Sequence, residues 1–329
     1  MTRVLSGIQP SGAMHLGNYF GAIKNFVREQ DHADAFYCVV DLHALTQNID
    51  PESLRKASLD LMAIYLASGL DPERCTLFLQ SHVAEHTQLA WLLECTASMG
   101  ELRRMTQFKD KGGDQEGTRV GLFTYPVLMA ADIVLYDVDR VPVGDDQRQH
   151  LELTRDLAQR FNHRFGDVFV IPEASIPSVG ARVMDLQEPT RKMSKSVSSP
   201  LGTVNMLDDP SDIERKIKKA VTDTDGELRY DPETKPGLAT LLSLLAACER
   251  VSPATIAQRY ERYGDLKKDV AAALIAELAP IQQRYEEFRN DPAALEAMMA
   301  VGAQKARSVA ARTYQRAADA IGLAPPVSH

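Results

Sequence analysis

The sequence predicts an α/β protein with a Rossmann-like, doubly wound parallel sheet, followed by a smaller all-helical domain. Three observations support this prediction. Short β-rich segments alternate with helical patterns in the first half of the chain, as they do in βαβ units. Past about residue 188 the strand patterns stop and long helical stretches follow. The length of 329 residues also exceeds what a single hydrophobic core usually serves.

Each expected element has a local pattern behind it. Asp50 and Pro51 supply an N-cap and a first-turn proline, apolar residues then recur at helical spacing, and Gly69 ends the predicted helix. A loop is expected at 223–234, which is acidic and rich in turn formers. Strands are expected at 3–6, 35–40, 76–80, 140–143 and 168–171, and further helices from near 17 and at 146–161, 211–221, 236–250, 265–290 and 291–318.

Composition and charge exclude several kinds of protein. With 44% hydrophobic and 25% charged residues, most of the chain can form a globular fold. A net charge of -8 argues against unspecific nucleic-acid binding, because that mode needs a broad basic surface. Basic patches at 215–219 and 305–316 leave specific binding open, with a solvated helix face as the alternative. We find no membrane-spanning run, signal-peptide core or CxxC pair, and expect a cytoplasmic protein with free thiols.

A glycine-rich turn follows the first predicted strand and leads into a helix. It reads Gly-Ile-Gln-Pro-Ser-Gly-Ala-Met-His-Leu-Gly-Asn over residues 7–18. Unpaired backbone N–H groups and the helix dipole make such a turn a general anion site. Gly12 and Gly17 have the spacing of a Walker P-loop, but Asn18 and Tyr19 replace its Lys and its Ser or Thr, and GxGxxG is absent. The turn therefore predicts a phosphate site of another kind.

A second candidate for phosphate binding lies at 192–196, which reads Lys-Met-Ser-Lys-Ser. Nearby prolines and a glycine predict a loop. Lys192 and Lys195 place two ammonium groups in this loop, and Ser194 and Ser196 add hydroxyl donors. These groups suit a polyphosphate that gains charge as a bond breaks. The alternative is a basic loop exposed to solvent.

Together the two segments resemble the paired signatures of class I aminoacyl-tRNA synthetases. His15-Leu16-Gly17-Asn18 is similar to the HIGH motif with asparagine in place of its last histidine, and residues 192–196 are identical to the KMSKS motif. Asn18 still offers a neutral donor one helical turn from His15. A finer resemblance, to bacterial-type tryptophanyl-tRNA synthetases, covers most of the first 200 residues and lies at 7–12, 100–102, 105–109, 125–126, 129–132 and 142–147.

The resemblance implies that Asp132 accepts the indole N–H of tryptophan. Pro126 is expected to begin a helix that places Met129 and Asp132 on one face, a soft sulfur beside an acceptor. Indole has a large apolar surface and a single N–H donor, so a carboxylate at the end of an apolar slot can read it. The alternative is that Met129 is plain core and Asp132 a surface charge. The tryptophan contacts implied are Asp132, Met129, Tyr125, Gln147, Val141, Val143 and His43, with His43 as a packed histidine the alternative.

The resemblance also implies which residues handle ATP. Asp145 and Asp146 would bind the ribose hydroxyls, although an aspartate before a helix is also an ordinary N-cap. The catalytic residues implied are His15, Asn18, Lys111, Lys192 and Lys195, with Lys111 a candidate phosphate contact from a glycine-rich loop. The ATP contacts implied are Gln9, Pro10, Ser11, Gly17, Asn18, Gly144, Asp145, Asp146, Val183, Lys192, Met193, Ser194, Lys195 and Ser196.

The implied activity is that of a tryptophan-tRNA ligase. ATP would activate L-tryptophan to tryptophanyl-adenylate with release of pyrophosphate, and the tryptophanyl group would pass to tRNA(Trp). Catalysis would consist of positioning and charge stabilisation, with Mg²⁺ carried on the ATP phosphates and no dedicated protein ligands for a metal. A homodimer is implied, with no DNA or membrane partner. The expected domains are 1–188 (Rossmann-like, catalytic), 189–202 (KMSKS loop), 203–290 (helical, contacting the anticodon) and 291–329 (C-terminal helix and tail, packing back on the catalytic domain).

Three alternatives remain open from the residues. A tyrosyl-type class I synthetase would share the fold but is expected to differ at 129–132. A small HxGH nucleotidyltransferase is disfavoured by the KMSKS segment and the helical domain after it. A non-catalytic paralogue that binds RNA or tryptophan is disfavoured because His15, Asp132 and both lysines of the loop are all present.

Overall fold

The computed structural model describes residues 1–110, 116–142, 144, 147–175, 183–194 and 199–325. A five-stranded sheet forms its centre, with the strand order β3-β2-β1-β4-β5 and every pairing parallel. The strands are β1 (Arg3–Ile8), β2 (Asp34–Val39), β3 (Thr76–Leu79), β4 (Arg140–Pro142) and β5 (Glu173–Ser175). The first four were predicted from the sequence and are confirmed, and so is the parallel α/β class.

Helices cover both faces of the sheet. Strand β1 lies at its middle, with β2 and β3 on one side and β4 and β5 on the other, so the strand order reverses at β1. The predicted helix after Asp50 is confirmed as α4 (Pro51–Ala67), with the Asp50 side chain accepting from the Ser53 N–H. The other helices of this part are α1 (Leu16–Asn18), the π-helical turn η1 (Tyr19–Ile23), α2 (Lys24–Glu29), α3 (Asp41–Ala44), η2 (Gln80–His82), α5 (Glu85–Glu94), α6 (Met99–Arg103), α7 (Thr106–Asp110), α8 (Val120–Val134) and α9 (Arg148–Phe165).

The predicted strand at 168–171 is wrong. The amide oxygen of Asn162, near the end of α9, accepts hydrogen bonds from the backbone N–H groups of Val168 and Phe169. Those N–H groups are therefore not available to pair with a neighbouring strand. The chain joins the sheet only at β5, a few residues later, where Glu173 pairs with Arg140.

The predicted start of a helix at Pro126 is also wrong. Helix α8 begins at Val120, and Pro126 lies inside it. Proline in a helix interior removes one backbone hydrogen bond and usually bends or ends the helix. Here α8 continues through the proline because it is packed between α5 and α9, and Pro126 itself is buried. Met129 and Asp132 still share a helix face, as expected, because both lie in the same continuous helix.

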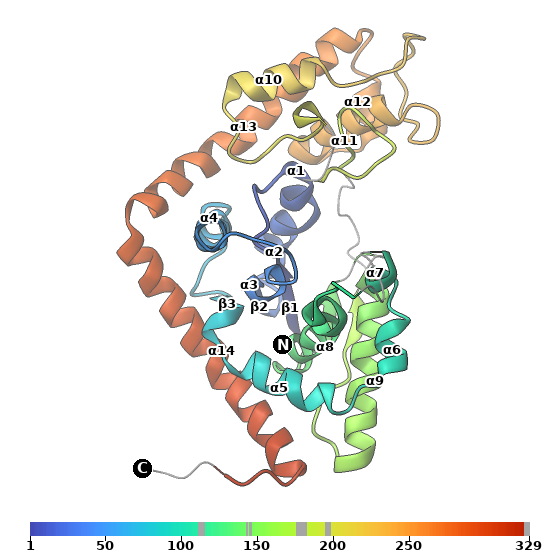
Figure 1. Cartoon of the computed structure of the whole chain (residues 1–329). Helices are drawn as coiled ribbons and strands as arrows, with labels where there is room; N and C mark the ends of the chain where they lie inside the picture. The colour runs from blue at the N-terminus through green and yellow to red at the C-terminus, as the bar shows by residue number, and fades with distance from the viewer. Residues whose placement is uncertain (111–115, 143, 145–146, 176–182, 195–198, 326–329) are drawn as a thin grey trace.

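Past residue 188 the described structure is helical, as predicted. Figure 1 shows α10 (Pro210–Lys218), α11 (Pro236–Glu249), α12 (Pro253–Ala257) and the first part of α13 (Tyr263–Asn290) gathered at one end of the molecule. A short turn η4 (Pro200–Gly202) precedes them. The segment 223–234 is a loop, as expected, and its Asp223 and Asp225 carboxylates bind the buried ammonium group of Lys235. In the described part of the chain, no helix has the length and apolar character needed to span a membrane.

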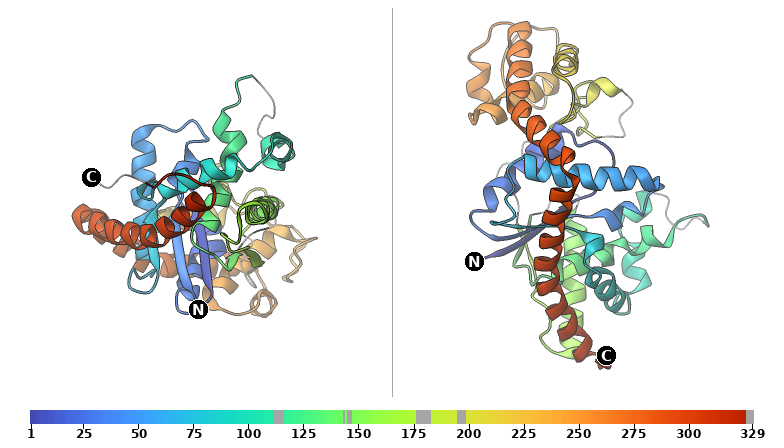
Figure 2. Two further views of the ribbon diagram at one scale, coloured as in Figure 1. Left: turned by 90° about the horizontal axis from the view of Figure 1, so that it is seen from below. Right: turned by 90° about the vertical axis from the view of Figure 1, so that its left-hand side faces the viewer.

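Helix α14 (Pro292–Ala320) leaves the helical end and runs along the side of the sheet (Figures 1 and 2). It passes beside the edge strand β3 and helix α5. At Gly302 the two backbones come so close that an added Cβ would meet the Leu77 carbonyl oxygen at 1.6 Å. The helix therefore covers an edge strand that would otherwise expose unpaired backbone groups.

Several side chains of the two predicted basic patches make specific contacts in the folded chain. Lys216 is buried in α10 and bonds the Asp208 carboxylate, so it does not belong to a solvated basic face. In the second patch, Lys305 and Arg307 donate to backbone carbonyl groups, and Arg316 pairs with Asp137. These contacts attach α14 to the body of the molecule.

Gly302→Ala tests the close approach of α14 to β3. We expect a loss of at least about 2 kcal/mol in the free energy of unfolding, because overpacking against a backbone carbonyl cannot be relieved by a side-chain rotation. Urea unfolding followed by circular dichroism measures it. Gly264→Ala in α13 is the matched control, since a Cβ there meets nothing within 4 Å. Equal stability of the two variants would contradict the packing of α14.

Candidate active site

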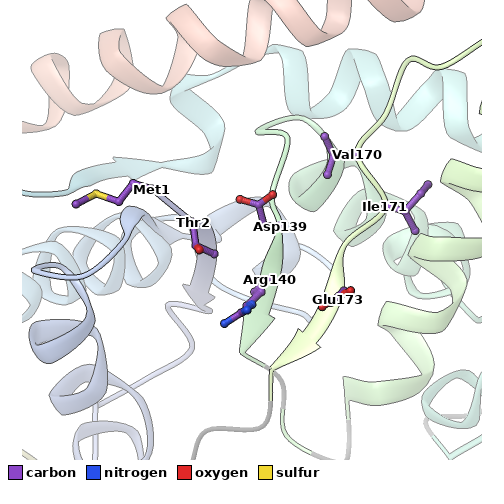
Figure 3. Close-up of a pocket in the computed structure, with 7 residues that line it drawn as sticks. All are labelled: Met1, Thr2, Asp139, Arg140, Val170, Ile171 and Glu173. Atoms are coloured by element: carbon purple, nitrogen blue, oxygen red, sulfur yellow. The ribbon is translucent and has the colours of Figure 1, made fainter.

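Several of the predicted site residues that the structure describes lie at the carboxyl edge of the sheet. Gln9 follows β1, His43 lies in α3 just after β2, and Gly144 follows β4. Parallel α/β sheets bind ligands at this edge because the strand ends and helix N-termini converge there. The hollow shown in Figure 3 lies at the opposite edge, where Thr2 precedes β1 and where Arg140 and Glu173 begin β4 and β5. None of the predicted site residues in the described part of the chain lines that hollow.

The turn after β1 is held by the segment that follows the KMSKS motif. The Leu16 N–H donates to the Val204 carbonyl at 3.0 Å, and the Met206 N–H donates to the Met14 carbonyl at 2.8 Å. The side-chain amide oxygen of Asn18 accepts a hydrogen bond from the His15 N–H at 3.2 Å. Residues separated by almost two hundred positions in sequence therefore form one unit, with His15 buried at its centre.

The first part of the KMSKS motif, residues 192–194, packs against the turn after β1. The Met193 N–H donates to the Val183 carbonyl at 3.0 Å, and the Met193 side chain is 1% exposed. Thr203 donates its hydroxyl to the Ser194 carbonyl at 3.1 Å. A Cβ added to Gly17 would lie 3.6 Å from the Met193 carbonyl oxygen and 2.9 Å from the His15 ring. The two signatures that sequence analysis paired are thus in contact, and Lys192 is exposed beside them.

Gly17→Ala tests this close approach. The new methyl group must displace the buried His15 ring, so we expect kcat/KM for ATP to fall about tenfold or more, since small displacements in an active site are costly. Steady-state pyrophosphate exchange measures it. Gly21→Ala, one helical turn further on, is the control because a Cβ there meets nothing within 4 Å. If both variants keep the parent rate, the HxGN turn does not position ATP.

One face of α8 carries groups expected to recognise the amino acid, and Tyr136, just after the helix, extends that face. Tyr125, Met129, Asp132 and Tyr136 recur at intervals of four, three and four residues, which places them on one side of a helix. Asp132 and Tyr136 are buried, whereas Tyr125 and Met129 are partly exposed. Met129 and the buried Val141 of β4 pack in the same hydrophobic cluster. This face therefore combines an apolar wall with a carboxylate.

Asp132 is a buried carboxylate held by three donors. Its Oδ1 accepts from Gln80 Nε2 at 2.7 Å and from His86 Nδ1 at 2.6 Å, and its Oδ2 accepts from His43 Nε2 at 2.7 Å. Burial alone would raise the pKa of this carboxyl group, but its interactions with His43 and His86 outweigh burial and hold the pKa well below the usual range. The alternative of a surface charge is therefore wrong, and Asp132 is an ionised acceptor inside the protein.

Other predicted contacts of the amino acid lie nearby. The Tyr125 hydroxyl is 2.8 Å from Nε2 of the buried His150, and its ring meets the His43 ring edge to face at 6.2 Å between centroids. Burial raises the pKa of Tyr125 to about 12, so its hydroxyl stays protonated at neutral pH. Gln147 precedes α9, and its N–H donates to the Gly144 carbonyl at 3.0 Å.

The remaining predicted site residues divide into two groups. Gln9 donates its side-chain amide to the His43 carbonyl at 3.3 Å, and its own carbonyl accepts from the Ser11 N–H at 2.8 Å. This contact joins the glycine turn to the expected amino-acid pocket. Pro10 is buried in the same turn. The residues Lys111, Val143, Asp145, Asp146, Lys195 and Ser196 lie outside the described part of the chain.

Gln80, His86, Tyr136 and His150 were not among the site residues predicted from the sequence. Gln80 had a usable signal, because it stood at the end of a predicted strand, where α/β sheets hold ligands. His86 had none, since it meets Asp132 across 46 residues and only because α5 packs on α8. Tyr136 continues the spacing of the α8 face by one helical turn, and that periodicity could have revealed it.

Comparison with known proteins agrees with this geometry. Residues 1–279 match the family model described as tRNA synthetases class I (W and Y). A parallel α/β sheet whose HxGN turn contacts a KMSKS segment is what that class requires. The fold and site therefore define a class I aminoacyl-tRNA synthetase.

The relatives narrow the class. A tryptophan–tRNA ligase from Mycobacterium leprae is 54% identical over 333 residues, which cover 98% of this chain and 97% of that protein. The crystal structure of a tryptophanyl-tRNA synthetase from Mycoplasma pneumoniae matches with a TM-score of 0.91 at 36% identity over 98% of each chain. One from Campylobacter jejuni, complexed with ADP and tryptophan, matches with a TM-score of 0.83 at 36% identity over 98% of this chain and 100% of that one. The chain belongs to the bacterial-type tryptophanyl-tRNA synthetases.

Proposed function

We propose that this chain joins L-tryptophan to tRNA(Trp) in two steps, which is the reaction that the names of its relatives describe. The tryptophan carboxylate attacks the α-phosphorus of ATP, the bond to the bridging oxygen breaks, and pyrophosphate leaves. A hydroxyl of the terminal ribose of the tRNA then takes the tryptophanyl group, and AMP leaves. The observation that carries this proposal is a buried, ionised Asp132 on the same sheet edge as the contacting HxGN and KMSKS segments.

For tryptophan, the proposal assigns recognition of the indole to the α8 face. Asp132 accepts the indole N–H, and Met129 and Val141 line the ring, with Val143 completing the wall. Tyr125 and Gln147 bind the α-ammonium group. A buried carboxylate discriminates strongly, because an amino acid without a matching donor leaves it unpaired.

For ATP, the proposal assigns the phosphates to the HxGN turn and the KMSKS segment. The amide oxygen of Asn18 already bonds the His15 N–H, so its Nδ2 is the group that would donate to a phosphate. Lys192 and Lys195 neutralise charge on the leaving pyrophosphate. Among the described residues, no cluster of His, Cys, Asp or Glu side chains could hold a metal ion. The proposal places Mg²⁺ on the ATP phosphates, with water completing its coordination.

The test is amino-acid-dependent exchange of labelled pyrophosphate into ATP, run with each of the twenty amino acids and without tRNA. We expect exchange with tryptophan and none of comparable rate with tyrosine or phenylalanine. Exchange with tyrosine would support the tyrosyl-type alternative. If no amino acid supports exchange while tryptophan still binds, the chain is a non-catalytic paralogue.

We also propose that two copies form a homodimer through the surface around α5 and α6, and that the helical part contacts tRNA. Trp91 on α5 and Met99 at the start of α6 are large apolar side chains, 65% and 60% exposed. For tRNA, the exposed Lys218 and Lys219 at the end of α10 supply positive charge.

Trp91 is the single tryptophan of the sequence, so its fluorescence reports on the dimer surface. We expect the emission maximum to move to shorter wavelength as protein concentration rises, in step with the dimer fraction from sedimentation. The shift follows because an interface removes water from the indole ring. A dimer by sedimentation without any shift places the interface elsewhere, and a monomer at all concentrations contradicts the proposal.

A further inference from the structure

Asp132 has more hydrogen-bond partners than reading one indole N–H requires. A carboxylate offers about four acceptor positions, two on each oxygen. Oδ1 uses both of its positions, for Gln80 and His86. Oδ2 uses one, for His43. A ligand N–H can therefore meet only the remaining position on Oδ2.

His86 is itself held by a second buried group. Its Nδ1 must carry the proton, because the ionised Asp132 oxygen only accepts. Its Nε2 lies 2.8 Å from the Tyr136 hydroxyl. Burial raises the pKa of Tyr136 well above its ordinary value, so the hydroxyl keeps its proton at neutral pH. Tyr136 thus holds the far nitrogen of the His86 ring and fixes the direction in which Nδ1 points.

The two histidines differ in burial. The His86 side chain is fully buried, whereas the His43 side chain is 12% exposed and belongs to the short helix α3. Gln80 is buried as well, and its side-chain oxygen accepts from the Leu42 N–H at 3.2 Å. The Oδ1 side of the carboxylate is therefore bonded to two buried side chains, and the Oδ2 side to the partly exposed His43.

We propose that His86, oriented by Tyr136, is a positioning residue for amino-acid specificity: it anchors Oδ1 of Asp132 and so directs Oδ2 toward the indole N–H. It touches neither substrate nor reacting atoms. This inference rests on the proposed role of Asp132 as the indole acceptor. Without this hydrogen bond, the carboxylate rotates about the Cβ–Cγ bond of Asp132. Oδ2 then no longer points at the indole N–H, and the preference for tryptophan over a similar ring without a donor is lost.

The experiment compares two amino acids that differ only at the indole nitrogen. Benzothienylalanine has a sulfur atom in place of the N–H group and nearly the same shape as tryptophan. We expect the parent protein to prefer tryptophan roughly 10- to 150-fold in kcat/KM, measured by pyrophosphate exchange. His86→Leu removes the donor to Oδ1 and should lower this ratio about fivefold or more.

His86→Asn is the matched variant, because its side-chain amide nitrogen lies close to the position of Nδ1. It should restore the ratio to within about twofold of the parent. Each ratio is measured on one preparation, so the folded fraction cancels. A merely structural role of His86 would lower both rates by one factor and leave the ratio unchanged, and that result overturns the inference.

Tyr136→Phe keeps the ring and removes only the hydroxyl, so it serves if His86→Leu does not fold. We expect it to lower the ratio about threefold. An unchanged ratio in Tyr136→Phe overturns the role given to Tyr136. If the parent itself does not separate the two amino acids, the assignment of Asp132 fails. If the parent separates them and all three variants keep its ratio, only the positioning role fails.

Discussion

Asp132→Ala is expected to lower kcat/KM for tryptophan roughly 10- to 150-fold, because it removes a charge-assisted hydrogen bond of about 1.5–3 kcal/mol. The same change should leave phenylalanine activation near the parent rate, since that ring has no donor for the carboxylate. Discrimination between the two amino acids should therefore narrow, while the KM for ATP stays close to the parent value. Pyrophosphate exchange with each amino acid measures both quantities.

The buried partners of Asp132 make a stability control necessary. Its removal leaves the donors on Gln80, His86 and His43 without their acceptor, and each such buried group costs about 1–3 kcal/mol. The ratio of the two amino acids is independent of the folded fraction, whereas the absolute rates are not. Asp156→Ala removes an exposed aspartate from the neighbouring helix α9 and is the control for charge. An unchanged ratio in Asp132→Ala would mean that the carboxylate does not read the indole.

Lys195→Ala is expected to slow formation of the adenylate about 10²- to 10³-fold, which is the usual effect of removing one group that stabilises charge in a transition state. Tryptophan binding should change little, because the lysine meets charge that develops only as pyrophosphate leaves. Single-turnover measurement of the adenylate gives the first quantity, and equilibrium binding of tryptophan gives the second.

Arg191→Ala is the matched control for Lys195. Arg191 precedes the motif, is exposed and pairs with Glu188 at 2.9 Å, so its loss removes one positive charge from the same segment. Surface pairs of this kind contribute little. Equal losses of rate and of tryptophan binding in Lys195→Ala would show that the lysine holds the loop together and does not act on the pyrophosphate.

The fold and the motifs could be predicted because the patterns that indicate them lie within short stretches of the sequence. A buried parallel strand needs only a short apolar run, and α4 needs only Asp50, Pro51 and a helical spacing of apolar residues. The KMSKS and HxGN segments are contiguous, so resemblance could identify both. The same local reasoning failed at 168–171, where the Asn162 side chain takes backbone N–H groups that an apolar run would otherwise use in a strand.

The class of fold, the two signatures and the candidate acceptor for indole could all be predicted from the amino-acid sequence. The burial and ionisation of Asp132 depend on the folded arrangement, because its partners Gln80, His86 and His43 lie 52, 46 and 89 residues away along the chain. The folded arrangement also places Lys216 in a buried ion pair and α14 over an edge strand. Propensities and caps act within a few residues, whereas burial and hydrogen-bond partners depend on which helices the finished sheet brings together.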